Sequence, residues 1–301
     1  MNQPAASASA SASAPVLVGV DGSSAGLDAV RWAGIEARRR RAPMHLVAAF
    51  GWPAGDDTRH RLRGAAYRST MREQCDRELA EAVAVVAEEF PDLTVTHGVE
   101  LGYPVATLAK AAAQAQLLVL GDRGRGGVAG LLLGSVAVSM AAHAACPVVV
   151  VRGRGSGAQD GPVVVGVDGS PASESAIAFA FAAADARDVE LVAVHTWNNL
   201  MADPGFPTVH ANDELEAPER ELLAERLAGW SQRYPGVRVT QVVRRARTAP
   251  LLVDHSTRAQ LVVVGSHAHD ALVGLVLGSV SHAVLHHADC PVAVVRPAIA
   301  V

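Results

Sequence analysis

The stretch VLVGVDGS at residues 16–23 returns as VVVGVDGS at residues 163–170, and this repetition decides the fold. A second pair follows in the same order, GLLLGSVAVSMAAHAACPVVVVR at 130–152 and GLVLGSVSHAVLHHADCPVAVVR at 274–296. The offsets between partners are 147 and 144 residues, so both order and spacing are retained. The chain therefore contains two copies of one structural unit.

Within each copy, short β-branched stretches alternate with longer Ala-rich stretches. Strands that are almost continuously apolar are typical of a sheet covered on both faces, and alternating strands and helices indicate parallel pairing with right-handed crossovers. The predicted fold class is α/β, with two tandem doubly wound, Rossmann-like domains of five parallel strands each. The first copy predicts strands near 15–20, 45–50, 93–99, 116–121 and 147–152 and helices near 24–41, 68–90, 104–114 and 134–144, and the second copy predicts strands near 162–167, 189–195, 237–243, 260–265 and 291–296.

The repeat also sets the domain organisation of the 301-residue chain. Residues 1–14 are nearly all Ala and Ser, which predicts a disordered tail. The first copy occupies 15–152 and the second 162–297, joined by a Gly-rich linker at 153–161. Helix-start signals agree with this division, because Ser170 before Pro171 and Thr248 before Pro250 predict the starts of helices.

Composition excludes several classes of partner. A net charge of −4 argues against a general electrostatic attraction to nucleic acid or to anionic lipid. The N-terminus has neither the basic start nor the apolar stretch of a secretory signal, and no run reaches the roughly 18 apolar residues that span a bilayer. Three widely spaced cysteines form no disulfide framework and no zinc motif. We therefore expect a cytoplasmic protein that binds neither membranes nor nucleic acid.

Two loops of the first copy have the composition of an anion site. The segment DGS at 21–23 follows the first strand, and GDRGRGG at 121–127 follows the fourth strand and leads to GS at 134–135. Ligands of open parallel sheets bind beyond the carboxyl ends of the strands. Glycine lets the backbone approach an anion closely, and the free amides at a helix start attract phosphate. These loops predict a phosphate-binding site.

Individual side chains of these loops have expected roles. Asp21, at the tip of the first strand, is placed to accept hydrogen bonds from a ribose hydroxyl, and Ser135 adds a hydroxyl donor at the helix start. Arg123 and Arg125 are expected either to add charge near the phosphates or to lie solvated on the surface.

Other nucleotide motifs do not fit. A Walker A loop needs GxxxxGK followed by Ser or Thr, and this string does not occur. Gly124, Gly126 and Ala129 match a loose GxGxxA pattern. However, that fingerprint belongs after the first strand and needs an acidic residue about 20 positions later. Here it follows the fourth strand, and residues 143–151 contain no acid.

The remaining string, Gly121-x2-Gly124-x9-Gly134-Ser135, together with VGVDGS and with Cys146-Pro147, resembles the universal stress protein family. The resemblance covers both copies. It implies a five-stranded α/β domain whose ATP-binding members hold phosphate through these glycines and the following Ser. It also implies that the first-strand Asp lies near the ribose and that the chain after the second strand, 49–51 here, borders the adenine. The implied ligand residues are Asp21, Gly22, Ser23, Gly51, Gly121, Arg123, Gly124, Gly134, Ser135 and Val136 in the first copy and Asp168, Gly265, Gly278 and Ser279 in the second.

The second copy departs from the pattern at one glycine. Its phosphate loop has Ala268 where the first copy has Gly124, and His267 and His269 replace the two arginines. If that position requires a positive φ, alanine costs about 1–2 kcal/mol, and its methyl group would press against a phosphate. We expect the second site to bind ATP at least about tenfold more weakly than the first.

The function that follows from the resemblance is regulatory binding of ATP, with Mg²⁺, in a stress response. Little or no catalysis is expected, because the loops contain no positioned nucleophile, no paired carboxylates and no lysine. Two alternatives stay open. One is an ATP-hydrolysing or adenylate-forming enzyme built on the same sheet, and the other is an interaction scaffold that binds no nucleotide.

Several of these residues also have purely structural interpretations. Asp21 and Asp168 can simply end strands and cap helices. His282 and His286 lie one helical turn apart, but no acidic or cysteine ligand completes a metal set in the sequence, so no metal site is predicted. Cys146 and Cys290 precede a proline and a strand and are expected to be buried as small hydrophobic residues.

The final strands carry a prediction about assembly. Val148–Val151 and Val292–Val295 are apolar and are expected at the sheet edge, where unprotected strands pair with other chains. We therefore expect burial of this edge against the other copy across a pseudo-two-fold axis, or against a second chain. A homodimer through the last strands of the domains is the corresponding partner prediction.

Overall fold

The computed structural model describes residues 13–51, 58–124, 133–152, 160–197, 211–266 and 277–297, with the side chains of all of these except 58–66 and 211–215. The predicted tail up to residue 12 and the linker residues 153–159 lie outside the described residues.

Strands and helices alternate along both copies, as the sequence predicts, and every predicted strand lies within about two residues of an observed one. The first copy contains β1 (Val16–Val20), α1 (Ser24–Arg40), β2 (Met44–Phe50), α2 (Thr58–Glu89), β3 (Val95–Leu101), α3 (Pro104–Ala112), β4 (Leu117–Gly121), α4 (Ser135–His143) and β5 (Val148–Val151). The second copy contains β6 (Val163–Val167), α5 (Pro171–Asp185), β7 (Leu191–Trp197), α6 (Ala211–Arg233), β8 (Val239–Arg245), α7 (Thr248–Ser256), β9 (Leu261–Gly265), α8 (Ser279–His287) and β10 (Val292–Val295).

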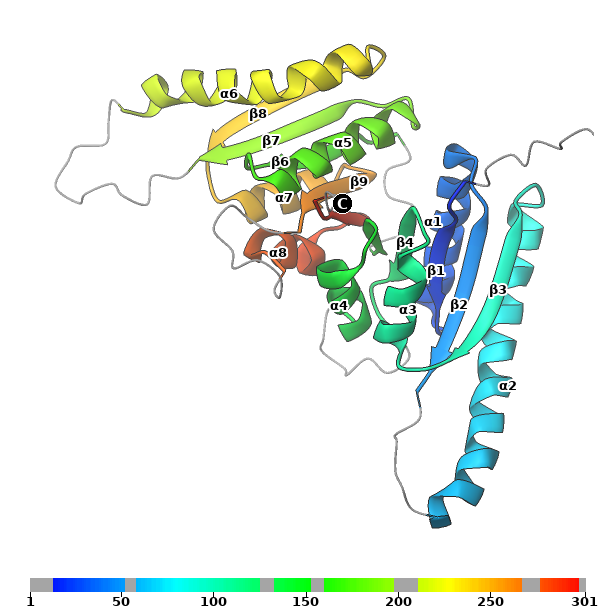
Figure 1. Cartoon of the computed structure of the whole chain (residues 1–301). Coiled ribbons are helices and arrows are strands. Elements are labelled where there is room, and N and C mark those ends of the chain that lie inside the picture. The colour runs from blue at the N-terminus through cyan, green and yellow to red at the C-terminus, as the bar shows by residue number, and fades with distance from the viewer. Residues whose placement is uncertain are drawn as a thin grey trace, which may run out of the picture.

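Helix α2 is longer than predicted. It begins at Thr58, whereas the sequence predicts a start near residue 68. The preceding stretch TRHRLRGAAY is mostly polar and contains a glycine, so it lacks the apolar periodicity by which a helix is recognised. The added turns extend α2 past the end of the sheet (Figure 1).

The strands form one sheet of ten, in the order β3-β2-β1-β4-β5-β10-β9-β6-β7-β8. Within each copy all pairing is parallel, which confirms the predicted doubly wound class. The copies join where β5 and β10 pair antiparallel, with Val149 opposite Ala293. Each copy therefore protects the final strand of the other, so the backbone edge that would have invited a further chain is occupied within the molecule.

β5 and β10 are each the edge strand of their own five-stranded unit, and their pairing confirms the expectation that this edge is buried against the other copy. The expected homodimer through these strands is corrected, because β5 has β4 and β10 as neighbours and β10 has β5 and β9. A homodimer cannot form by adding a strand to either of them. The outer strands of the sheet are β3 and β8, and dimerisation itself stays a prediction without an assigned surface.

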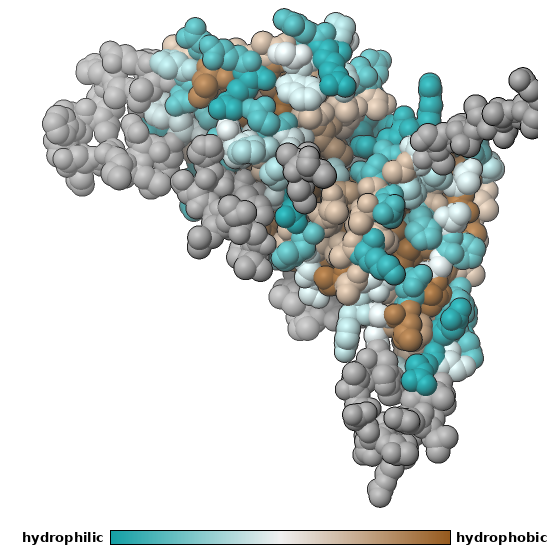
Figure 2. All heavy atoms as spheres, viewed as in Figure 1, coloured by the Kyte–Doolittle hydropathy of each residue, from teal (hydrophilic) through white to brown (hydrophobic). Residues whose placement is uncertain are grey.

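Helices cover both faces of the sheet (Figure 1). Alternate strand residues enter two separate cores, so that Val16 and Val18 lie in the core that includes residues of α1, α2, α5 and α6, whereas Leu17 lies in the core that includes residues of α3, α4, α7 and α8. Hydrophilic residues cover much of α6 in the space-filling view (Figure 2). In the described ranges, no helix combines the length and the apolar character needed to cross a bilayer.

A buried ion pair also joins the two copies. The carboxylate of Glu36 on α1 lies 2.6 Å from Nη2 of Arg187, which follows α5, and both side chains are at most 2% exposed. Arg40 reaches the other carboxylate oxygen at 2.6 Å. The Arg187 guanidinium lies over the ring of Trp32, and that of Arg40 lies over Phe179 of the second copy. The contact therefore combines charge pairing with aromatic packing across the junction.

Candidate functional site

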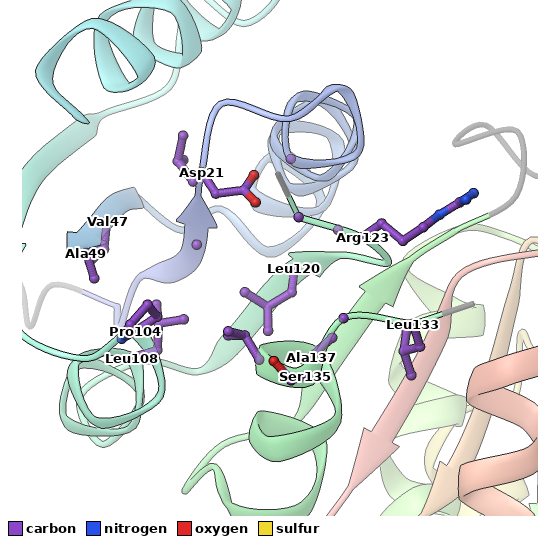
Figure 3. Close-up of a pocket in the computed structure, with 17 residues that line it drawn as sticks. Asp21, Val47, Ala49, Pro104, Leu108, Leu120, Arg123, Leu133, Ser135 and Ala137 are labelled. Atoms are coloured by element: carbon purple, nitrogen blue, oxygen red, sulfur yellow. The ribbon is translucent and has the colours of Figure 1, made fainter. Parts of the chain in front are cut away.

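A cavity of about 350 Å³ opens at the carboxyl ends of β1 and β4 in the first copy (Figure 3). Between these neighbouring strands the chain changes direction across the sheet, since β2 and β3 extend to one side and β5 lies on the other. This is the topological switch point at which doubly wound sheets bind ligands. The volume falls within the range of small-molecule sites, about 300–1,000 Å³.

The cavity has two chemically different ends. One end is apolar, between Val47 and Ala49 on β2 and Pro104 and Leu108 on α3. We call this end the slot. The other end is lined by glycines of the loop after β4 and by the first turn of α4, where Ser135 and Ala137 lie close together (Figure 3).

The polar end leaves backbone amides of α4 available. Gly134 is the N-cap of α4 and, having no side chain, makes no capping bond to the first amides of this helix. The Gly134 amide donates to the carbonyl of Asp122 at 2.7 Å, which holds the loop after β4 against the start of the helix.

Asp21 organises the opposite wall. Its Oδ1 accepts hydrogen bonds from the amide of Ser23 at 3.1 Å and from the Ser23 hydroxyl at 2.6 Å. The Ser23 hydroxyl oxygen also accepts from the amide of Gly26 at 3.0 Å and so caps α1. Ser23 therefore fixes the orientation of Asp21, and its own hydroxyl is used in bonds to Asp21 and Gly26.

Gly124 lies directly against Asp21. A Cβ at Gly124 would stand 2.4 Å from Oδ2 of Asp21, far closer than atoms can pack. The two loops therefore touch only because this position has no side chain. The structure thus explains Gly124 by the close approach of the two loops to each other, whereas the sequence analysis explained the glycines by close approach to an anion.

The structure brings together most of the predicted site residues. The Arg123 side chain points away from the cavity (Figure 3), and its Nε lies 3.7 Å from Oδ2 of Asp122. Gly22, with φ +72°, and Ser23 form the turn behind the cavity, and Gly51 lies beneath the ring of Tyr103. Arg125 lies outside the described residues. Those that line the cavity are Asp21, Gly121, Arg123, Gly124, Gly134, Ser135 and Val136.

Sequence reasoning identified only part of the slot, since the family resemblance implied residues 49–51 and so included Ala49 but not the other lining residues. Val47, Pro104 and Leu108 are apolar residues of the kind that fills any core, and neither of the loops identified from composition contains them. The one usable signal was position, because the end of the second strand and the helix start after the third strand lie on the same edge of a parallel sheet as the glycine loop.

In the second copy a hydrogen bond bridges the positions that correspond to the slot. Thr196 occupies the register position of Ala49, and Thr248 opens α7 as Pro104 opens α3. Their hydroxyl oxygens are 2.6 Å apart. Thr248 was expected to cap α7, but the N-cap is Arg247, and the Thr248 hydroxyl bonds Thr196 instead. A direct bridge therefore stands where the first copy has a methyl group and a proline ring.

Two further hydroxyls narrow the polar end of the second copy. Ser173 replaces Gly26, and its Oγ accepts from the Asp168 amide at 3.2 Å. Ser281 replaces Ala137, and its hydroxyl donates to the carbonyl of Gly265. Both serines are buried. Gly278 and Ser279 begin α8 as expected, whereas His267, Ala268 and His269 lie outside the described residues.

Cys146, Cys290 and the paired histidines show no second reactive site in the described residues. Burial raises the pKa of Cys146 to about 11 and that of Cys290 to about 12, so neither thiol supplies a thiolate near neutral pH. His282 and His286 have ring centroids 4.4 Å apart. Across the described ranges, no three His, Cys, Asp or Glu side chains gather as a metal set.

The fold and the cavity together define a tandem, doubly wound α/β protein with an open switch-point cavity in its first copy. The sequence pattern of the universal stress protein family matches residues 13–152 and 161–296, and the chain belongs to this family. The resemblance inferred from the motifs is thereby confirmed.

Individual relatives agree over nearly the whole length. A universal stress protein of Mycolicibacterium smegmatis is 43% identical over 297 residues, covering 94% of this chain and 97% of the relative. One of Mycobacterium tuberculosis is 40% identical over 298 residues, covering 93% and 96%. The crystal structure of a universal stress protein from Archaeoglobus fulgidus matches with a TM-score of 0.66 and covers 95% of this chain and 99% of that one. Its identity is 16%, so this likeness shows the fold alone.

Proposed function

We propose that the chain is a regulatory nucleotide-binding protein that holds one ATP in the first copy, with Mg²⁺ and with little or no catalysis. The observation that carries this proposal is the two-ended cavity, apolar at Ala49 and Pro104 and amide-rich at Gly124 and Gly134. A nucleotide is complementary to both ends, because it has a flat aromatic base and an anionic phosphate chain.

The expected placement follows from this match. The base enters the slot, where the side chains offer apolar contact. The phosphates meet the amides at the start of α4, where the helix dipole favours negative charge. Asp21 then stands between the two ends and faces the sugar.

Asp21 is the carboxylate that lines the cavity among the described residues. Mg²⁺ commonly binds through one or two carboxylates together with substrate phosphates and water. The residues present therefore fit an ion that is held mainly by the nucleotide itself, with Asp21 as the protein's contribution. When bound, such an ion supplies charge neutralisation to the phosphates.

The direct test is to purify the full chain without added nucleotide, denature it and identify by chromatography what is released. Isothermal titration of emptied protein with ATP, ADP and AMP then gives affinity and stoichiometry. Absence of any released nucleotide, together with no heat and no thermal shift in millimolar Mg-ATP, contradicts the proposal and favours the scaffold alternative. Turnover well above about 1 s⁻¹ favours an enzyme instead.

We expect one ATP per chain, because the second slot is bridged by Thr196 and Thr248. Restoring the missing glycine by Ala268→Gly is therefore expected to leave the titration at one site per chain. The matched control is Gly278→Ala, which alters the helix start of the second copy and is expected to leave ATP affinity within about twofold of wild type. Two equal sites in the wild type, or a second site created by Ala268→Gly alone, contradicts the assignment of the bridge as a barrier.

A further inference from the structure

An exposed aromatic ring stands beside the slot of the first copy. Tyr103 directly precedes Pro104, which lines the slot, and is 62% exposed. Its ring lies over Gly51, since a Cβ built there would be 2.9 Å from Cδ1 of Tyr103. Gly51 comes two residues after Ala49, which lines the slot from β2. The ring therefore spans the gap between the end of β2 and the start of α3.

The backbone under this ring is firmly held. The amide of Gly102 donates to the carbonyl of Phe50 at 2.9 Å, which ties the end of β3 to β2. The carbonyl of Tyr103 accepts from the amide of Thr107 at 3.0 Å in the first turn of α3. One face of the ring rests on Gly51 while most of the side chain stays in solvent, so the ring contributes little to the core and is available to a ligand.

The second copy lacks this feature. The residue before Thr248, which opens α7, is Arg247. There the slot is already bridged by Thr196 and Thr248. The aromatic ring thus accompanies the open slot and is replaced by a charged side chain beside the closed one.

We propose that Tyr103 contacts the nucleobase and forms the outer wall of the slot. This inference rests on the proposed function, that the first copy binds a nucleotide. An aromatic ring attracts the flat face or the edge of a purine, and such contacts strengthen the binding of a base severalfold. Because the ring stands at the end of the cavity remote from the glycine loop, its contribution is independent of the number of phosphates.

The test is isothermal titration of the full chain with ATP, ADP and AMP. Tyr103→Ala is expected to raise all three dissociation constants by about five- to tenfold. Tyr103→Phe keeps the ring and is expected to stay within about twofold of wild type. Gly51→Ala pushes the ring from its support and is expected to resemble Tyr103→Ala, because the added methyl group would collide with Cδ1.

Leu101→Ala is the matched control, since Leu101 is a neighbouring apolar side chain of almost equal exposure, 64%, that lies at the end of β3, whereas the Tyr103 ring lies over Gly51. Saturation transfer between the Tyr103 ring protons and the adenine protons gives a readout independent of affinity. Wild-type protein that binds none of the three nucleotides overturns the proposed function and this inference with it. Wild-type protein that binds them while Tyr103→Ala binds them equally well overturns the role of Tyr103 alone, as does a loss confined to ATP.

Discussion

Replacing Glu36 by glutamine is expected to lower the free energy of unfolding by about 3–5 kcal/mol, the usual cost of leaving a buried charge without its partner. Arg187 is 1% exposed at the side chain and has Glu36 as its carboxylate partner at 2.6 Å. The amide cannot neutralise it. Urea unfolding at pH 7 measures the change, because the shift in midpoint reports the stability loss where the slope is unchanged.

An exposed pair that joins α1 to α2 provides the control. Arg31 and Glu89 are joined at 2.8 Å, but their side chains are 44% and 39% exposed. Water screens this pair, so Glu89→Gln is expected to cost less than about 1 kcal/mol. Equal effects of Glu36→Gln and Glu89→Gln would show that the junction pair contributes no more than a surface contact.

The same pair makes a prediction for pH. Burial alone would raise the pKa of Glu36, but the charges of Arg187 and Arg40 outweigh burial and hold this pKa below its ordinary value of 4.5. A carboxyl group with a lowered pKa stabilises the fold above its unfolded pKa and loses that contribution as pH falls through the folded pKa. The stability difference between wild type and Glu36→Gln is therefore expected to be full at pH 7 and to shrink below about pH 4.5.

Replacing Gly124 by alanine is expected to weaken ATP binding by about tenfold to a hundredfold, or about 1.4–2.7 kcal/mol. The added methyl group would lie 2.4 Å from Oδ2 of Asp21, so Asp21 or the glycine loop must move. Either movement disturbs the bond from Ser23 to Asp21 and the amides offered to the phosphates. Isothermal titration with Mg-ATP measures the loss, and protein purified from cells should release no nucleotide.

Gly134→Ala is the comparison variant, because a methyl group added there does not collide with the protein itself, whereas one added at Gly124 does. A Cβ at Gly134 meets its nearest neighbour at 3.5 Å, an ordinary contact, so this variant is expected to keep the stability of the nucleotide-free protein. Unchanged ATP affinity in Gly124→Ala would show that the phosphates lie elsewhere. The placement of the phosphates at the glycine loop would then have to be abandoned, although the fold would be unaffected.

The sequence predicted the architecture because the information is local and repeated. Apolar runs such as VVVV at 148–151 identify buried strands, and the same order of elements occurs twice. The sequence also predicted the two loops of the site, since their glycines and the DGS turn indicate close backbone approach even when the residues packed against them are unknown. These features account for the polar end of the cavity.

The rest depends on contacts between distant residues. Thr196 and Thr248 are 52 positions apart, and only the fold brings their hydroxyls together. Glu36 and Arg187 are 151 positions apart. Val47 and Leu108 look like any core residues until the sheet places them on a cavity wall. Composition likewise could not decide whether the last strands would be buried against the other copy or against a second chain.

The antiparallel seam between β5 and β10 has a consequence for how the molecule responds to dilution. Two separate chains joined in this way would come apart as their concentration fell, whereas a covalent tether keeps the effective concentration of each half high at any dilution. The second copy therefore stays paired with the first and keeps the edge of β5 covered at any dilution. If the first copy binds one nucleotide as we propose, its site keeps this neighbour at every protein concentration.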